Sequence, residues 1–167
     1  MDLSIKDAYV AGCIGRVVEL HARFYKRLVD FGLPFEARVA AEMATFFQRY
    51  EAGRDGVWLA VNGDEEIHGC VAIDASHLAQ GGAAHLRWFI CSDATRGTGI
   101  GGQLLARAMA HCDAIAAPGV ELWTFEGLGA ARRLYERHGF CLVHQQTGAQ
   151  WGREVMEQRF ERRRVPP

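Results

Sequence analysis

A glycine-rich segment near the middle of the chain constrains the possible folds more than any other feature. The segment consists of Arg96, Gly97, Thr98, Gly99, Ile100, Gly101 and Gly102. It lies between a β-prone run over 85–91 and a segment with helical spacing of apolar residues. Alternating glycines leave backbone N–H groups unshielded at the positive end of the helix dipole, which is how a pyrophosphate is held. The segment therefore predicts a strand–loop–helix unit that can bind a nucleotide-like ligand.

The same glycines also satisfy a second, weaker pattern. Gly97, Gly99 and Gly102 fit the dinucleotide-binding fingerprint, and Glu126 follows the next strand near the position of a ribose-binding acid. A dinucleotide domain, however, has these glycines after its first strand and needs several further βα units. Only 65 of the 167 residues follow Gly102, so position in the chain argues against this alternative.

The residues before the loop predict two helices and three strands. Apolar residues recur at three- and four-residue spacing over 14–32 and again over 34–53, as in amphipathic helices. Short β-prone runs follow over 57–62, 67–76 and 85–91, separated by turn signals. Three neighbouring strands with short turns indicate an antiparallel sheet.

The residues after the loop predict a mixed sheet. A helix opened by the glycines leads to a strand over 120–125, and a second helix follows over 131–138. Because the connection from strand 85–91 to strand 120–125 is long and helical, these two strands should be parallel. The last two runs, over 140–147 and 151–160, should form an antiparallel pair.

Composition excludes several classes of protein. Hydrophobic residues make up 49% and charged residues 23% of the chain, which fits a single globular domain over 1–160 with a short tail over 161–167. A net charge of −1 argues against nucleic acid as a partner. No apolar stretch has the length of a membrane span and the N-terminus lacks a signal pattern, so we expect a cytoplasmic protein. Five cysteines without a CxxC pair and seven histidines without HExxH predict neither disulfides nor a metal site.

Two motifs together resemble one protein family. Arg96, Gly99 and Gly101 fit a phosphate loop with Arg or Gln, two residues, Gly, one residue, then Gly or Ala. The second motif, Ala-x-x-Leu-Tyr-Glu-x-x-Gly-Phe, is met over Ala131–Phe140. This pair resembles the GNAT superfamily of acyl-CoA N-acyltransferases. Three further segments, 86–89, 122–128 and 151–154, resemble more narrowly the acetyltransferase half of bacterial MarR-type fusion proteins, although the winged helix of those fusions is absent here.

The resemblance covers about residues 4–160 and implies an α/β fold of the α+β type. The GNAT fold has a central mixed, mostly antiparallel sheet of six or seven strands with about four flanking helices. It implies an N-acetyltransferase that moves an acetyl group from acetyl-CoA, without a metal, to a primary amine of a small molecule or peptide by direct attack. Homodimers are common in this family, and the terminal strands could supply the edges.

The resemblance also assigns candidate site residues. The loop amides would hold the coenzyme A pyrophosphate, and the main chain of Phe89, Ile90 and Cys91 would pair with pantetheine and donate to the oxyanion. Tyr135 would bind the cofactor and protonate the leaving sulfur, although packing on its helix is the alternative. Glu126 could be the base that yields a neutral amine, or an ordinary acid at a helix N-terminus.

One position departs from the family pattern. Many members have Asn three residues before the signature Ala131, and this chain has Leu128 there. The hydrogen bond of that Asn would be missing. The alternative function is therefore an acyl-CoA-binding sensor or interaction module with little or no catalysis.

The acceptor site is less readable. By alternation, His85 and Arg87 share one strand face, and either could line this site. The same alternation places Leu86, Trp88 and Ile90 on the opposite face. Three tryptophans could shape an aromatic pocket or pack in the core: Trp88, Trp123 and Trp151. Four residues of the first two helices could face the acceptor, but the sequence does not orient them: Glu19, His21, Tyr25 and Glu42.

Overall fold

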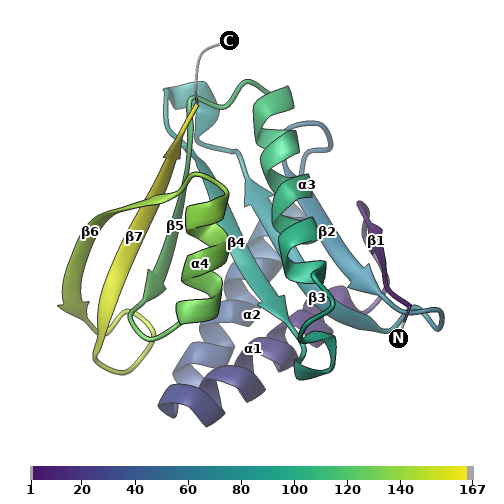
Figure 1. The fold of residues 1–167 in the computed structure, drawn as a ribbon, viewed down its shortest axis with the longest axis vertical. Coiled ribbons are helices and arrows are strands. Elements are labelled where there is room, and N and C mark those ends of the chain that lie inside the picture. The colour runs from purple at the N-terminus through teal and green to yellow at the C-terminus, as the bar shows by residue number, and fades with distance from the viewer. Residues whose placement is uncertain (1, 165–167) are drawn as a thin grey trace.

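The computed structural model describes residues 2–164 and contains a central seven-stranded sheet (Figure 1). The strands are β1 (Ser4–Lys6), β2 (Gly56–Val61), β3 (Ile67–Asp74), β4 (Ala84–Cys91), β5 (Gly119–Phe125), β6 (Cys141–Gly148) and β7 (Val155–Arg163). They are ordered β1-β2-β3-β4-β5-β7-β6 across the sheet. This mixed, mostly antiparallel sheet confirms the predicted fold class.

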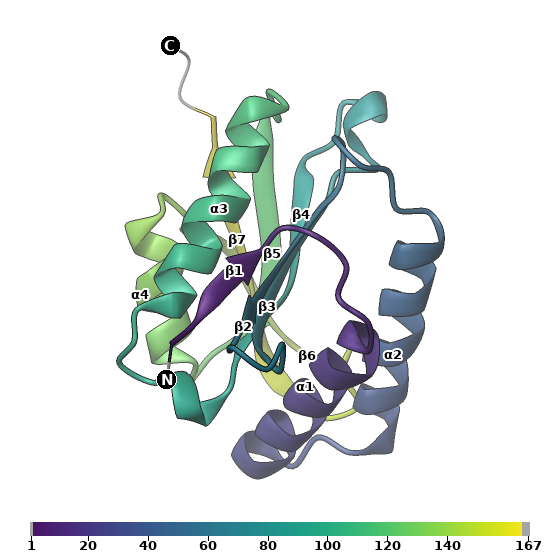
Figure 2. The same cartoon turned by 90° about the vertical axis from the view of Figure 1, so that its right-hand side faces the viewer.

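Four helices cover the two faces of the sheet (Figure 2). Helices α1 (Cys13–Val29) and α2 (Leu33–Gln48) lie on one face, and α3 (Ile100–Ala114) and α4 (Gly129–Arg137) lie on the other. Each pair buries its apolar stripe against the sheet, so the sheet separates two hydrophobic cores. Two short 3-10 helices, Leu78–Gln80 and Asp93–Thr95, flank β4. Within residues 2–164, no helix has the length and apolar composition needed to cross a bilayer.

The strand pairings confirm most of the predicted order. Strands β2, β3 and β4 are antiparallel, β4 and β5 are parallel, and β6 and β7 are antiparallel. The sequence did not predict β1 as a separate strand, nor the insertion of β7 between β5 and β6. The predicted last strand also begins later, at Val155, because Gly152 has a φ of 93° in the preceding turn.

The end of β7 corrects the expected C-terminal boundary. Residues 161–163 belong to the strand, and Arg163 pairs with Gly119. The Arg162 guanidinium donates to both carboxylate oxygens of Asp113 at 2.9 and 3.0 Å. The predicted tail over 161–167 is therefore shorter than expected, and its residues 165–167 lie outside the described part of the chain.

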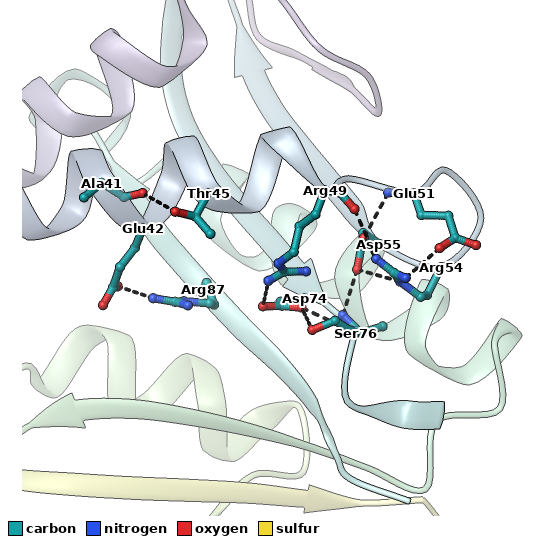
Figure 3. Close-up of polar contacts among 11 residues, drawn as sticks. Ala41, Glu42, Thr45, Arg49, Glu51, Arg54, Asp55, Asp74, Ser76 and Arg87 are labelled. Atoms are coloured by element: carbon teal, nitrogen blue, oxygen red, sulfur yellow. Dashed lines mark hydrogen bonds and ion pairs between the residues drawn. The ribbon is translucent and has the colours of Figure 1, made fainter. Parts of the chain in front are cut away.

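A buried carboxylate fastens the end of α2 to the sheet (Figure 3). The Asp55 side chain is fully buried and accepts hydrogen bonds from the backbone N–H groups of Glu51 at 3.0 Å and Ala75 at 2.9 Å. Arg54 Nη2 pairs with the same carboxylate at 2.7 Å. These contacts join the α2–β2 connection to the end of β3 and so fix where α2 crosses the sheet.

We expect Asp55→Ala to lower the free energy of unfolding by about 2–4 kcal/mol, because it leaves two buried N–H groups without an acceptor and breaks an ion pair. The matched control is Glu51→Ala. The exposed Glu51 carboxylate also pairs with Arg54, at 2.6 Å, and its loss should cost less than about 1 kcal/mol. Urea denaturation measures both values. Equal losses in the two variants would contradict this role of Asp55.

Candidate functional site

The sheet opens between β4 and β5. These parallel strands pair only at Ala84↔Val120 and His85↔Glu121 and then diverge (Figure 1). The other edge of β4 pairs with β3, and the other edge of β5 pairs with β7. Within residues 2–164, the later part of β4 therefore has no strand partner on the side of β5. Its amides and carbonyls are available to an extended ligand.

A bulge changes the direction of the β4 side chains. Trp88 has a φ of 49°, which is uncommon for a residue other than glycine, and the register with β3 shifts at this point. Trp88 and Ile90 consequently join Arg87 on the face of α1 and α2, whereas Phe89 and Cys91 pack with α3 and α4. The prediction from simple alternation, which put Trp88 and Ile90 opposite Arg87, is wrong for this reason.

A cleft of about 380 Å³ lies where the strands part. Its walls come from α1, α2, β4, β5, α4 and the loop before β7. His85 and Arg87 line it, as the sequence suggested. Trp88, Trp123 and Trp151 also line it. The sequence could not decide whether these three tryptophans shape a pocket or pack in the core, and the structure places all three at this one cavity.

The structure orients the candidate residues of the first two helices. His21, Tyr25 and Glu42 line the cleft. Glu19 lies outside it and accepts a hydrogen bond from Arg16 Nη1 at 2.7 Å. The cleft thus receives two side chains from α1 and one from α2 among the four candidates.

Burial keeps three polar cleft residues uncharged near neutral pH. Desolvation lowers the pKa of His21 to about 4, and its Nδ1 lies 2.8 Å from the Val17 carbonyl oxygen. The pKa of His85 is lowered first by burial and then by the Arg87 guanidinium. Burial raises the pKa of Tyr25 to about 12. Because burial disfavours protonation of both imidazoles, His21 and His85 add neutral hydrogen-bonding groups to the cleft.

Several residues that line the cleft were not predicted as site residues, among them Phe31, Phe35, Arg38 and Gln150. Arg38 was open to detection, because it precedes Glu42 by four residues and such pairs meet on a helix surface. Arg38 Nε indeed donates to Glu42 Oε1 at 2.8 Å. Gln150 had no usable signal, since it lies in a loop whose path depends on the tertiary fold.

The glycine loop has the conformation of an anion-binding turn. Gly97 and Gly99 have φ values of 78° and 77°, and Gly99 directly precedes α3. A methyl carbon on either glycine would meet no atom within 4 Å, so this side of the loop is open. The first amides of α3 lack intrahelical acceptors, although Thr98 Oγ1 accepts weakly from Ile100 N–H at 3.3 Å. The side chain of Arg96 is 76% exposed beside them.

The two sequence motifs meet at the start of α3. A methyl carbon on Gly101 would lie 3.5 Å from Leu134 Cδ1, 3.5 Å from Phe89 Cζ and 3.6 Å from Cys91 Sγ. One on Gly102 would lie 3.8 Å from Leu134 Cδ2. The loop, the α4 signature and the unpaired part of β4 therefore converge at one place.

Tyr135 lies between the core and the cleft. Its ring packs against Phe89, Phe140 and Phe160, with centroid separations of 5.9, 6.0 and 6.1 Å, and the residue also lines the cleft. Burial raises the pKa of Tyr135 above its ordinary value, so the phenol keeps its proton. Tyr135 therefore packs in the core and also borders the cleft, and its role as a proton donor stays a prediction.

Glu126 is not brought to the same cavity. It is exposed and lines an adjoining recess with Leu128 and Arg132, and its backbone N–H donates to the Met156 carbonyl at 2.9 Å. Leu128 caps α4 without a side-chain hydrogen bond to the helix. A role for Glu126 as a base stays a prediction and requires an intervening water.

Neither a disulfide nor a cluster of potential metal ligands occurs among the described residues. All five cysteines are free thiols, and burial raises the pKa of Cys91 to about 11, which disfavours the thiolate. Among the described residues, no group of three or more His, Cys, Asp or Glu side chains could hold a metal ion.

Comparisons with known proteins agree with this geometry. A family model described as the acetyltransferase (GNAT) domain matches residues 53–141. No curated protein sequence matches the chain. A GNAT-family acetyltransferase from Staphylococcus aureus Mu50 has a TM-score of 0.75 at 16% identity, covering 97% of this chain and 99% of the other.

Two further solved structures share the fold. A putative acetyltransferase from Salmonella typhimurium, solved with its cofactor acetyl-CoA, has a TM-score of 0.70 at 17% identity over 100% of this chain and 98% of the other. The NatC complex bound to Gag peptide and CoA has a TM-score of 0.76 at 16% identity over 99% and 100%.

These matches also decide between the broad and the narrow resemblance. None of them supports the narrower resemblance to MarR-type fusion proteins. The family model covers more than half of the 167 residues, including the glycine loop and the α4 signature. The chain therefore belongs to the GNAT acetyltransferase family.

Proposed function

We propose that this protein transfers an acetyl group from acetyl-CoA to a primary amine of a small molecule or peptide. The observation that carries the proposal is the close approach of Leu134 and Phe89 to Gly101, where an added methyl carbon would lie 3.5 Å from each side chain. The open side of the glycine loop, the edge of β4 that has no strand partner within residues 2–164, and the Tyr135 phenol would lie along one path. That order matches the pyrophosphate, pantetheine and sulfur of coenzyme A.

Two parts of the chain would hold acetyl-CoA, the glycine loop and the backbone of β4. Gly97 and Gly99 leave the open side of the loop free for a pyrophosphate beside the α3 N-terminus. The backbone of Phe89, Ile90 and Cys91 would pair with the pantetheine amides, as a β-strand pairs with a peptide. The Salmonella structure with acetyl-CoA and the NatC structure with CoA support this choice of co-substrate.

The chain's own groups would then serve three chemical needs. Acetyl-CoA supplies a thioester, whose C–S bond breaks as the acceptor nitrogen forms a bond to the acetyl carbon. The β4 main chain would donate a hydrogen bond to the carbonyl oxygen as it gains charge. Tyr135 would give its proton to the departing sulfur, and Glu126 would take a proton from the amine through water. The products are the N-acetyl amine and the free thiol of coenzyme A.

The proposal includes the setting of the reaction. We place the protein in the cytoplasm as a single domain that extends through β7, without a membrane partner. Its net charge of −1 argues against nucleic acid as a partner. A homodimer could form at the free edge of β6, since β6 lies at the end of the sheet.

Ligand-induced stabilisation tests the co-substrate. At 100 times the dissociation constant, a ligand of the native state adds about 2.7 kcal/mol of stability, or roughly 5–10 °C in melting temperature. We expect acetyl-CoA and coenzyme A to raise the melting temperature and NAD to leave it unchanged. A shift with NAD alone would restore the dinucleotide alternative, and no shift with coenzyme A would contradict the proposal.

A glycine pair supplies the matched control for this test. Gly99 and Gly53 have φ values of 77° and 87°, and neither would place a methyl carbon within 4 Å of another atom. Gly99→Ala and Gly53→Ala should therefore destabilise the free protein similarly, by about 1–2 kcal/mol. Only Gly99→Ala should weaken acetyl-CoA binding, by about 10-fold or more, because its methyl group enters the expected phosphate site.

Tyr135→Phe tests the proton donor. The ring contacts remain, so we expect unchanged acetyl-CoA binding and a fall in kcat of about 100-fold, measured by thiol release. Tyr50→Phe is the control, since Tyr50 is partly buried outside the cleft and should keep full activity. Full activity of Tyr135→Phe would leave Tyr135 with its packing role alone.

Glu126→Gln tests the base. A base acting through water contributes less than a direct one, so we expect a fall in kcat of about 10-fold with an unchanged KM for acetyl-CoA. An unchanged kcat would remove Glu126 from the mechanism. Acetyl-CoA binding without turnover of any amine would instead favour the sensor function that Leu128 suggests.

A further inference from the structure

Three charged side chains lie together in the cleft: Arg38 and Glu42 of α2 and Arg87 of β4. We call them the Arg38–Glu42–Arg87 cluster. Arg38 Nε donates to Glu42 Oε1 at 2.8 Å, and Arg87 Nη2 donates to Glu42 Oε2. Figure 3 shows Glu42 and Arg87 directed toward each other from the helix and the strand. Two cations share one carboxylate, which leaves a formal charge of +1.

The remaining polar groups of the cleft do not offset this charge. Burial lowers the pKa of His21 and His85 and raises that of Tyr25 and Tyr135, so all four are neutral at pH 7. Among the described residues that line the cleft, only the cluster is charged. The cleft is therefore cationic, which favours an anionic group on the ligand and disfavours a second ammonium group.

Arg87 is suited to hold a carboxylate. Its guanidinium carbon lies 4.6 Å from the Trp88 ring centroid, so the indole covers one face of the fork. Within residues 2–164 its ion pair with Glu42 engages Nη2, which leaves Nε and Nη1 as donors. The side chain is 24% exposed and thus reachable from the cleft.

The cleft also limits the size and polarity of the rest of the acceptor. Aromatic rings form one wall, with Phe125 at 5.7 Å from Trp151 and 5.5 Å from Phe31 between ring centroids. The volume of about 380 Å³ is near the lower end of the range of roughly 300–1,000 Å³ for ligand pockets. Arg87 is two residues from Phe89, whose ring contacts Tyr135 at 5.9 Å. Arg87, Phe89 and Tyr135 all line this one cleft, so an anion on Arg87 and an amine at the reacting centre would lie within the same cavity.

We propose that the acceptor is a small amino acid with an apolar or aromatic side chain, and that Arg87 binds its carboxylate while Glu42 orients Arg87. This inference rests on the proposed acetyl transfer. It distinguishes the protein from enzymes that acetylate polyamines, whose additional ammonium groups the cluster would repel. The amine is the group acetylated, and the carboxylate takes no part in the bond changes.

Matched acceptors test the proposal. Thiol release from acetyl-CoA is measured with L-amino acids, their α-amides, the corresponding decarboxylated amines and spermidine. We expect turnover of at least one apolar or aromatic amino acid, with a KM about 10- to 100-fold lower than that of its amide or amine. Equal or better turnover of amides, amines or spermidine would overturn the inference while leaving acetyl transfer intact. So would turnover of no amino acid by a protein that binds acetyl-CoA, whereas failure to bind acetyl-CoA overturns the proposed function itself.

Variants of Arg87 separate recognition from folding. Arg87→Gln should raise the KM for the amino acid about 10- to 100-fold, with kcat and acetyl-CoA binding changed less than about threefold. It should also reduce the preference for acid over amide to within about threefold. Arg87→Lys keeps the charge without the fork and should give an intermediate preference.

Arg162→Gln is the control. Arg162 is 22% exposed in a comparable ion pair with Asp113 outside the cleft, so its loss should leave the preference unchanged. An unchanged acid preference in Arg87→Gln would overturn the assignment of Arg87.

Discussion

The parting of β4 from β5 is the constraint on which the rest of this structure depends. A sheet normally pairs every interior strand on both edges, and β4 loses one partner after His85 while keeping β3 on the other edge. The bulge at Trp88 accompanies this change and turns Phe89 toward α3 and α4. One distortion thus exposes backbone polar groups and places aromatic side chains on both sides of them.

The two faces of the sheet have separate tasks at this opening. On one face, α3 and α4 bring the glycine loop and Tyr135 to the strand edge, where coenzyme A would lie. On the other face, α1 and α2 supply the aromatic wall and the Arg38–Glu42–Arg87 cluster. The co-substrate and the acceptor would therefore approach from opposite sides. Binding of coenzyme A would then depend on α3 and α4, and selectivity for the acceptor would depend on α1 and α2.

Most of the fold could be predicted from the sequence, because helical periodicity, turn signals and the two motifs are local features. The prediction of which β4 side chains share a face was wrong because the bulge at Trp88 breaks simple alternation. No residue type at this position predicts a bulge. The order β5-β7-β6 depends on long-range pairing and had no local signal. For the site, the loop and Tyr135 follow from motifs, whereas Phe31 and Gln150 reach the cleft only through the paths of the α1–α2 connection and the loop before β7. Glu126 follows β5 as predicted, but it lines the adjoining recess and not the cleft.

The glycine loop and the edge of β4 that faces away from β3 would together bind an acyl-CoA. Hydrogen–deuterium exchange of the backbone amides, with and without acetyl-CoA, tests this binding most directly, because exchange reports the pairing of individual segments. We expect slower exchange over 89–91 and 97–102 when acetyl-CoA is present, with β6 unchanged as an internal reference. Protection confined to other segments, or none at a saturating concentration, would contradict the claim.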